Sequence, residues 1–221
     1  MSPATQPADP VVLARRLLAG PVHGHPRPRH LVGICGAPGA GKSTLAALLV
    51  DELNRRLPGS AAVVPMDGFH LAASVIAGDA RGTRRGAPDT FDPDGYAALL
   101  HRLRENRDDV VFAPEYRREL EDPVAGALPV PRSCRIVVTE GNYLLHPDPA
   151  WRRVRARLDE VWFLEAPDEQ LRVARLIERH ERFGKSAEHA RSHVLGSDER
   201  NAALIAAHRN GADLVLRWPQ W

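Results

Sequence analysis

The sequence predicts a single α/β domain in which a mostly parallel five-stranded sheet lies between layers of helices. Five short apolar runs, rich in β-branched residues, alternate with longer helical patterns, as expected for parallel strands joined by crossover helices. A chain of 221 residues also suits one hydrophobic core. Ligands of open α/β sheets bind beyond the carboxyl ends of the strands, so residues that follow the strands are the first candidates for a functional site.

The predicted elements divide the chain, residues 1–221, into a core and three attached regions. Strands are predicted at residues 31–36, 61–66, 135–139, 160–165 and 213–217, and helices at 10–19, 42–56, 93–105, 168–183 and 187–208. Residues 1–30 are interpreted as a tail, a helix capped by Asp9 and a Pro- and Gly-rich linker over 20–30. Residues 67–131, rich in Gly, Pro, Arg and Asp, are expected to form a substrate-side insertion with a short strand near 110–113.

Composition argues against several classes of partner. The chain has 30 basic and 28 acidic residues and a formal net charge of +2, which gives no general reason to expect nucleic acid or an anionic membrane surface as partner. No segment approaches the roughly 18 apolar residues of a membrane span, and residues 1–10 lack the pattern of a secretion signal. Cys35 and Cys134 lie far apart in apolar surroundings, which favours reduced thiols and a cytoplasmic location.

The segment GAPGAGKST, residues 36–44, has the spacing of a Walker A phosphate-binding loop. It follows an apolar strand and precedes a helical pattern, the context that this motif requires. Backbone N–H groups and the helix N-terminus can bind phosphate, Lys42 can reach the β- and γ-phosphates, and the Ser43 hydroxyl can ligate Mg²⁺. The predicted nucleotide-binding residues are Gly36, Ala37, Pro38, Gly39, Ala40, Gly41, Lys42, Ser43 and Thr44.

Two acidic residues end predicted strands, Asp67 after VVPM and Glu140 after IVVT. Both should therefore lie at the sheet edge that carries the phosphate-binding loop. Phosphoryl transfer to a hydroxyl needs an acid that helps to hold Mg²⁺ and gains from one that accepts the hydroxyl proton. Spacing alone does not say which acid has which role.

Together, GAPGAGKST, MDGFH (residues 66–70), EGNYLL (residues 140–145) and an arginine-rich helix resemble the phosphoribulokinase/uridine kinase family of P-loop kinases. That family includes type I pantothenate kinases and fructokinase-like and nucleoside-kinase-like relatives. The resemblance implies a three-layer P-loop NTPase fold, ATP and Mg²⁺ as cofactors, and transfer of the γ-phosphate to a hydroxyl of a small molecule. It also implies that Asp67 is the general base and that Glu140, with Ser43, binds Mg²⁺.

The segment RLIERHERFGK, residues 175–185, places Arg175, Arg179 and Arg182 on one helical face. It resembles the family's lid, whose arginines close over ATP phosphates and stabilise charge on the transferred group. Residues 168–208 are accordingly assigned to the lid and the helices that follow. Arg179 and Arg182 are the predicted catalytic pair, with a solvated helical face as the alternative for either residue.

The candidates for acceptor binding are His70, Tyr116, Arg118 and Asn142. Tyr116-Arg117-Arg118 stands where pantothenate kinases typically carry Tyr-Ser-His, which argues against pantothenate. The two arginines suit an acceptor with an anionic group, or they pair with neighbouring acids at positions 119, 121 and 122. His70 has a structural role as its alternative.

Two further features concern the C-terminal region. Asn201, in SDERNAALI, lies in a segment that resembles the fructokinase-like relatives and is expected near the nucleotide. Trp218 and Trp221 are expected to cover either the hydrophobic core or a partner subunit. A homodimer is therefore one of the alternatives.

The motifs favour an ATP-dependent kinase whose acceptor is a sugar, a nucleoside or a pantothenate-like molecule. The alternative is a non-catalytic ATP-binding regulatory protein, against which the two acids and the lid argue. A GTPase switch is excluded, because its guanine-reading motif needs a lysine after an asparagine and neither Lys42 nor Lys185 follows one.

Overall fold

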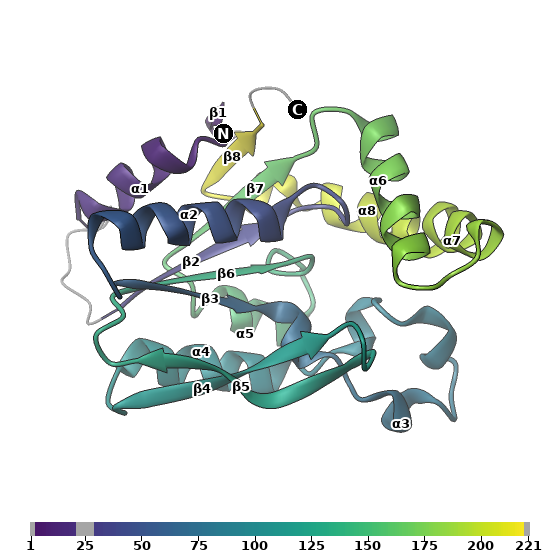
Figure 1. Ribbon diagram of the computed structural model, residues 1–221, viewed down its shortest axis with the longest axis horizontal. Coiled ribbons are helices and arrows are strands. Elements are labelled where there is room, and N and C mark those ends of the chain that lie inside the picture. The colour runs from purple at the N-terminus through teal and green to yellow at the C-terminus, as the bar shows by residue number, and fades with distance from the viewer. Residues whose placement is uncertain (1–2, 21–28, 219–221) are drawn as a thin grey trace.

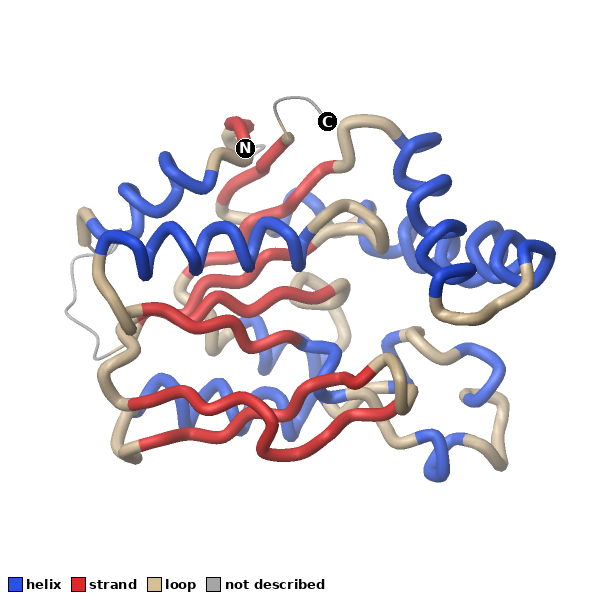
Figure 2. The backbone as a smooth tube through the Cα atoms, in the orientation of Figure 1, coloured by secondary structure: helices blue, strands red, loops and turns tan. Residues whose placement is uncertain are grey.

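A sheet runs through the middle of the molecule (Figure 2). It has six strands, and every neighbouring pair of them is parallel. This computed structural model describes residues 3–20 and 29–218; most of the predicted linker and Trp221 lie outside the described residues. The strand order is β1 (Thr5–Pro7), β8 (Leu214–Arg217), β7 (Glu160–Glu165), β2 (His30–Cys35), β6 (Ile136–Gly141) and β3 (Ala61–Pro65). The carboxyl ends of these strands therefore share one edge of the sheet.

Helices cover both faces of the sheet (Figure 1). One face carries α1 (Pro10–Leu18) and α2 (Lys42–Arg56), and the other carries α4 (Pro93–Glu105), α5 (Pro149–Arg155) and α8 (Glu199–Ala206). Side chains alternate along β2, so that Leu31 joins the core on the α4 face while Val32 and Ile34 join the core on the α2 face. The predicted three-layer α/β fold is confirmed.

All five predicted strands are present, and β1 is a sixth that the sequence did not indicate. The interpretation of residues 1–10 as a tail missed it, because three residues with Thr, Gln and Pro show no apolar alternation. β1 pairs with the edge of β8, from Thr5↔Val215 to Pro7↔Arg217. The predicted cap of the next helix is confirmed, since the Asp9 carboxylate accepts a hydrogen bond from the backbone N–H of Val11 at 2.8 Å.

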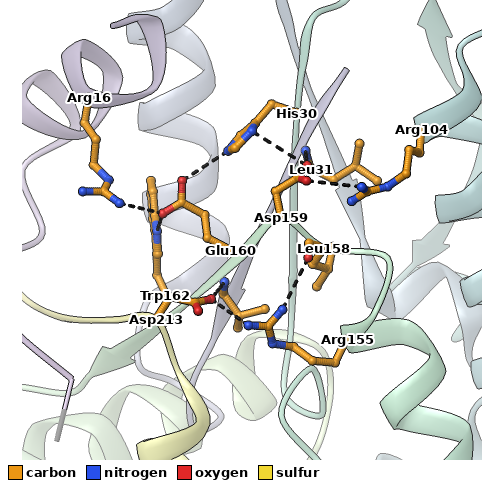
Figure 3. A network of polar contacts seen from close by, with 11 residues as sticks. Arg16, His30, Leu31, Arg104, Arg155, Leu158, Asp159, Glu160, Trp162 and Asp213 are labelled. Atoms are coloured by element: carbon orange, nitrogen blue, oxygen red, sulfur yellow. Dashed lines mark hydrogen bonds and ion pairs between the residues drawn. The ribbon is translucent and has the colours of Figure 1, made fainter. Parts of the chain in front are cut away.

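A buried polar network fixes the N-terminal helix to the centre of the sheet (Figure 3). The carboxylate of Glu160, at the start of β7, accepts hydrogen bonds from Arg16 of α1 at 2.9 Å and from the Trp162 indole at 2.8 Å. The His30 ring at the start of β2 lies 3.2 Å from the same carboxylate. One buried acid thus joins β7 to two elements near the N-terminus, α1 and β2.

The insertion between β3 and β6 holds more structure than predicted. It contains α3 (Ala73–Ile76), then α4, then an antiparallel hairpin of β4 (Val110–Arg117) and β5 (Asp122–Pro131) that forms a separate sheet. The short strand predicted near residues 110–113 is only the beginning of β4. The hairpin approaches the 3₁₀ turn Met66–Phe69 so closely that a Cβ at Gly68 would collide with the Pro114 carbonyl group. Glycine is therefore needed at position 68.

The lid side of the molecule consists of α6 (Glu169–Arg182) and α7 (Ala187–His193), which lie beyond the carboxyl edge of the sheet (Figure 1). The prediction of one continuous helix over 187–208 is wrong at residues 194–198. There a π-helical turn, Val194–Asp198, separates α7 from α8. This turn includes Gly196, a residue that weakens a regular α-helix. Among the described helices, none has both the length and the apolar character needed to cross a membrane.

Candidate active site

The predicted phosphate-binding loop connects β2 to α2, and Lys42 is the first residue of that helix. Gly41 precedes it with φ of 90°, a left-handed conformation that glycine adopts without strain. Gly36 lies against β7, where a Cβ would come within 2.5 Å of the Leu164 carbonyl oxygen. The loop can therefore take this path only with glycine at these two positions.

A cavity of about 750 Å³ opens between this loop, the insertion and the lid. Six of the predicted nucleotide-binding residues line it: Pro38, Gly39, Gly41, Lys42, Ser43 and Thr44. Gly36, Ala37 and Ala40 do not. Their role is within the loop: the Ala37 carbonyl accepts a hydrogen bond from the Lys42 ammonium at 3.1 Å, and the Ala40 carbonyl accepts one from the Trp218 indole at 3.2 Å.

Lys42 is a buried cation, with 7% of its surface exposed. Burial lowers the pKa of its ammonium group, and the negative charge of Glu140 acts in the opposite direction. The side chain is held at the base of the cavity by the Ala37 carbonyl, so its charge is directed at whatever occupies the loop. This arrangement suits a bound anion.

Ser43 and Glu140 meet across the base of the cavity, where the Ser43 hydroxyl donates a hydrogen bond to Glu140 Oε1 at 2.8 Å. Glu140 is 6% exposed, and burial followed by the nearby Asp67 charge raises the pKa of its carboxyl group. A hydroxyl and a carboxylate, both hard oxygen donors, are the ligands that Mg²⁺ prefers beside phosphate oxygens. The residues present therefore fit a magnesium ion.

Asp67 lies in the 3₁₀ turn that follows β3 and lines the same cavity as Glu140. Its carboxylate accepts no hydrogen bond from another described residue, whereas its backbone carbonyl accepts one from the Nδ1–H of His70 at 2.8 Å. The His70 ring also packs on Phe91 and Tyr116, with ring centroids 4.0 and 4.8 Å away. Burial lowers the pKa of His70, so the ring is neutral and fixes the turn that presents Asp67.

The four predicted acceptor-binding residues all line the cavity: His70, Tyr116, Arg118 and Asn142. The alternative that Arg118 pairs with nearby acids does not hold in this structure, because its guanidinium lies over the ring of Phe183, 5.3 Å from the centroid. Arg117 does pair with acids, with Glu115 at 2.7 Å and Glu119 at 3.9 Å.

The two arginines of the predicted catalytic pair, Arg179 and Arg182, lie in different environments. Arg179 lines the cavity, and so do Arg175 and Lys185. Arg182 does not: it pairs with Glu178 at 3.0 Å on the surface, and 70% of its side chain is exposed. Burial, and to a smaller extent the positive charge of Arg118, lowers the pKa of the Arg179 guanidinium. This direction is expected for a cation that is buried near another cation.

Sequence reasoning missed Arg172, which joins the lid to the phosphate-binding loop. Its side chain is 1% exposed and donates hydrogen bonds to the Pro38 carbonyl at 3.0 Å and to Glu169 at 2.7 Å, with a further bond to Glu199. The only signal in the sequence was its spacing: Arg172 precedes Arg175 by three residues and so lies on the same helical face as the predicted lid arginines. Asn201, expected near the nucleotide, does line the cavity.

The chain is similar to known kinases in sequence and in structure. A protein of Schizosaccharomyces pombe named "Putative uridine kinase" is 32% identical over 196 residues, which cover 86% of this chain and 83% of that protein. The "ATP-dependent kinase-like protein notR'" of Aspergillus versicolor is 34% identical over 156 residues, which cover 65% of this chain and 88% of that protein.

A solved structure agrees with these relatives. The crystal structure of a "putative fructose transport system kinase" from a Silicibacter species has a TM-score of 0.83 and 38% identity, covering 96% of this chain and 99% of that one. No protein-family model matches the chain. With the loop, the two strand-end acids and the lid in place, the chain belongs to the phosphoribulokinase/uridine kinase family of P-loop kinases.

Proposed function

We propose that this protein transfers the γ-phosphate of ATP to a hydroxyl group of a small molecule. The observation that carries the proposal is that Ser43, Glu140 and Asp67 line one cavity together with the phosphate-binding loop, with Ser43 hydrogen-bonded to Glu140. The relative from Aspergillus versicolor, whose name describes an ATP-dependent kinase-like protein, supports ATP as the nucleotide.

The nucleotide half of the site consists of the loop and the lid. Backbone N–H groups at the start of α2 and the Lys42 ammonium bind the β- and γ-phosphates, and Arg179 neutralises charge on the transferred group. Ser43 and Glu140 hold Mg²⁺, which when bound offsets phosphate charge. Catalysis then depends on positioning and charge neutralisation, because phosphoryl transfer asks little covalent chemistry of the protein.

The acceptor half consists of Asp67 and the insertion. Asp67 is the better general base because its carboxylate has no hydrogen-bond donor among the described residues, whereas Glu140 is engaged by Ser43. The acceptor oxygen bonds to the γ-phosphorus as the bond to the ADP oxygen breaks, and Asp67 takes the hydroxyl proton. Tyr116, Arg118 and Asn142 border the space in which the acceptor would lie.

The test is ADP release measured across a panel of sugars, nucleosides, pantothenate and hydroxy acids. On the best acceptor, Asp67→Asn should lower kcat by about 100-fold or more, while ATP still binds. The matched control is Asp109→Asn, because the Asp109 side chain is 93% exposed and does not line the cavity. A full rate in Asp67→Asn would disprove the assignment of the base.

A second variant tests the nucleotide half. Lys42→Ala should abolish turnover and leave the melting temperature close to that of the parent, since the ammonium makes one hydrogen bond within the part of the chain that the structure describes. Arg55→Ala is the control on the same helix, because Arg55 is exposed and its one ion-pair partner among residues 3–20 and 29–218 is Glu52. Tight ATP binding without a product on any acceptor would contradict the kinase proposal and favour a regulatory protein.

A further inference from the structure

Three side chains with metal-binding atoms meet in the lid: His180 near the end of α6, His193 at the end of α7 and Asp198 at the end of the π-helical turn. His180 Nε2 lies 3.1 Å from Asp198 Oδ2, and His193 Nε2 lies 4.0 Å from Asp198 Oδ1. One ligand atom from each residue lies within 4.8 Å of the other two. In the part of the chain that the structure describes, no other group of three or more His, Cys, Asp or Glu side chains is arranged in this way.

These separations are close to those of a tetrahedral metal site. Bonds of about 2.0–2.2 Å to Zn²⁺ place neighbouring ligand atoms about 3.3–3.5 Å apart. The observed 3.1 and 4.0 Å, which involve the two different oxygens of the Asp198 carboxylate, lie on either side of that value. With one ligand atom from each residue the separations extend to 4.8 Å, so the three side chains must draw together by about 1 Å to hold one ion.

The π-helical turn explains why His193 and Asp198 face the same point. In a regular α-helix, residues five positions apart are turned about 140° from each other around the axis. A π-helical turn bonds each residue to the one five positions on and brings the two nearly above one another. The π-helical turn thus brings the side chains of His193 and Asp198 toward the same side of the helix.

The donor set differs in chemistry from the Ser43–Glu140 pair. Two imidazole nitrogens with one carboxylate oxygen suit Zn²⁺, Co²⁺ or Ni²⁺, whereas Mg²⁺ prefers oxygen ligands alone. The side chains of His180 and Asp198 are 17% and 13% exposed, and that of His193 is 29% exposed. All three line the cavity, so a fourth coordination position is open to water or to a bound ligand.

We propose that His180, His193 and Asp198 bind a divalent transition-metal ion of the Zn²⁺ class and so join α6 to the segment formed by α7 and the π-helical turn. The cations Arg179 and Lys185 line the same cavity and oppose a second cation. The site therefore binds more weakly than a closed structural zinc site. This proposal does not rest on phosphoryl transfer, since metal binding is measured on its own.

The experiment uses the full chain, stripped with a chelator and then titrated with Co²⁺ in excess Mg²⁺. We expect one Co²⁺ per chain, with the intense visible absorption of tetrahedral cobalt, and displacement by Zn²⁺. His193→Ala and Asp198→Asn should each weaken binding by at least about 10-fold. His193 makes no hydrogen bond to another described residue within 3.5 Å, so His193→Ala should fold normally. This variant therefore tests the proposal even if Asp198→Asn fails to fold.

Two controls separate this site from other histidines. His189→Ala removes an exposed histidine of the same helix that is not part of the cluster. The double variant His23→Ala/His25→Ala removes the His-Gly-His segment of the sequence. Both should bind Co²⁺ as the parent does. Absence of the absorption in the parent, or unchanged binding in His193→Ala, would overturn the proposal.

Discussion

The guanidinium carbon of Arg118 lies 5.3 Å from the centroid of the Phe183 ring, which brings the turn after β4 to the end of lid helix α6. Both residues line the cavity. An exposed contact between a cation and an aromatic face is worth about 0.5–1 kcal/mol. The insertion and the lid thus meet through a weak contact between two residues that line the cavity.

If this contact holds the site closed, Arg118→Ala and Phe183→Ala should lower kcat/KM by similar small factors. The double variant should lose no more than either single variant, so a double-mutant cycle should give a coupling energy of about 0.5–1 kcal/mol. A rise in the acceptor KM for Arg118→Ala alone would show instead that Arg118 binds the acceptor.

Arg179 and Arg182 should differ in their effect on catalysis, although they lie three residues apart on one helix. Arg179→Ala should lower kcat by about 100-fold or more, because it removes a cation from the cavity wall. Arg182→Ala should change kcat less than twofold, since an exposed ion pair contributes about 0–1 kcal/mol and Glu178 is the one ion-pair partner of Arg182 among the described residues. Steady-state kinetics decides, and equal losses would refute the distinction.

Arg172→Ala should destabilise the protein and loosen the phosphate-binding loop. Removing this buried guanidinium leaves the Pro38 carbonyl without its donor and Glu199 without its partner, at a cost of about 2–3 kcal/mol. Urea unfolding measures that cost, and the KM for ATP should rise. Arg153→Ala is the control, because its pair with Asp94 is more than half exposed; its unfolding free energy should stay within about 0.5 kcal/mol of the parent.

Glu160 should make the stability of the protein depend on acidity. Burial raises the pKa of this carboxyl, but hydrogen bonds from His30, Trp162 and Arg16 outweigh burial and set the pKa at about 2, below the ordinary 4.5. The ionised group therefore stabilises the fold above pH 4.5, and this contribution, about 3 kcal/mol, is lost as the pH falls toward 2.

The check is urea unfolding at a series of pH values from 7 down to 2.5. Glu160→Gln should be less stable than the parent at pH 7 and should lose less stability on acidification. Glu119→Gln is the control, because the Glu119 side chain is 68% exposed and its nearest cation is 3.9 Å away. Parallel curves for the parent and Glu160→Gln would contradict the role assigned to this network.

The parts of the site that sequence predicted are those set by local order along the chain. The phosphate-binding loop follows β2, Asp67 lies in the turn after β3 and Glu140 is the penultimate residue of β6, and parallel strands bring such positions to one edge. The choice between Arg175 and Arg182 depended on how α6 is rotated against the core, which periodicity does not define for a row of arginines. Arg172 and β1 were missed because each is stabilised by distant partners, the Pro38 carbonyl and β8.

The insertion is one continuous stretch of the chain between β3 and β6, and this has an evolutionary consequence. Residues between β3 and β6 contribute Tyr116 and Arg118 on one side of the cavity, while the phosphate-binding loop and α6 form the other side. Under the proposed function, a change in this one continuous stretch of the gene would change which molecule receives the phosphate. The machinery that holds the nucleotide would be inherited intact, and a single scaffold could give rise to kinases with unrelated acceptors.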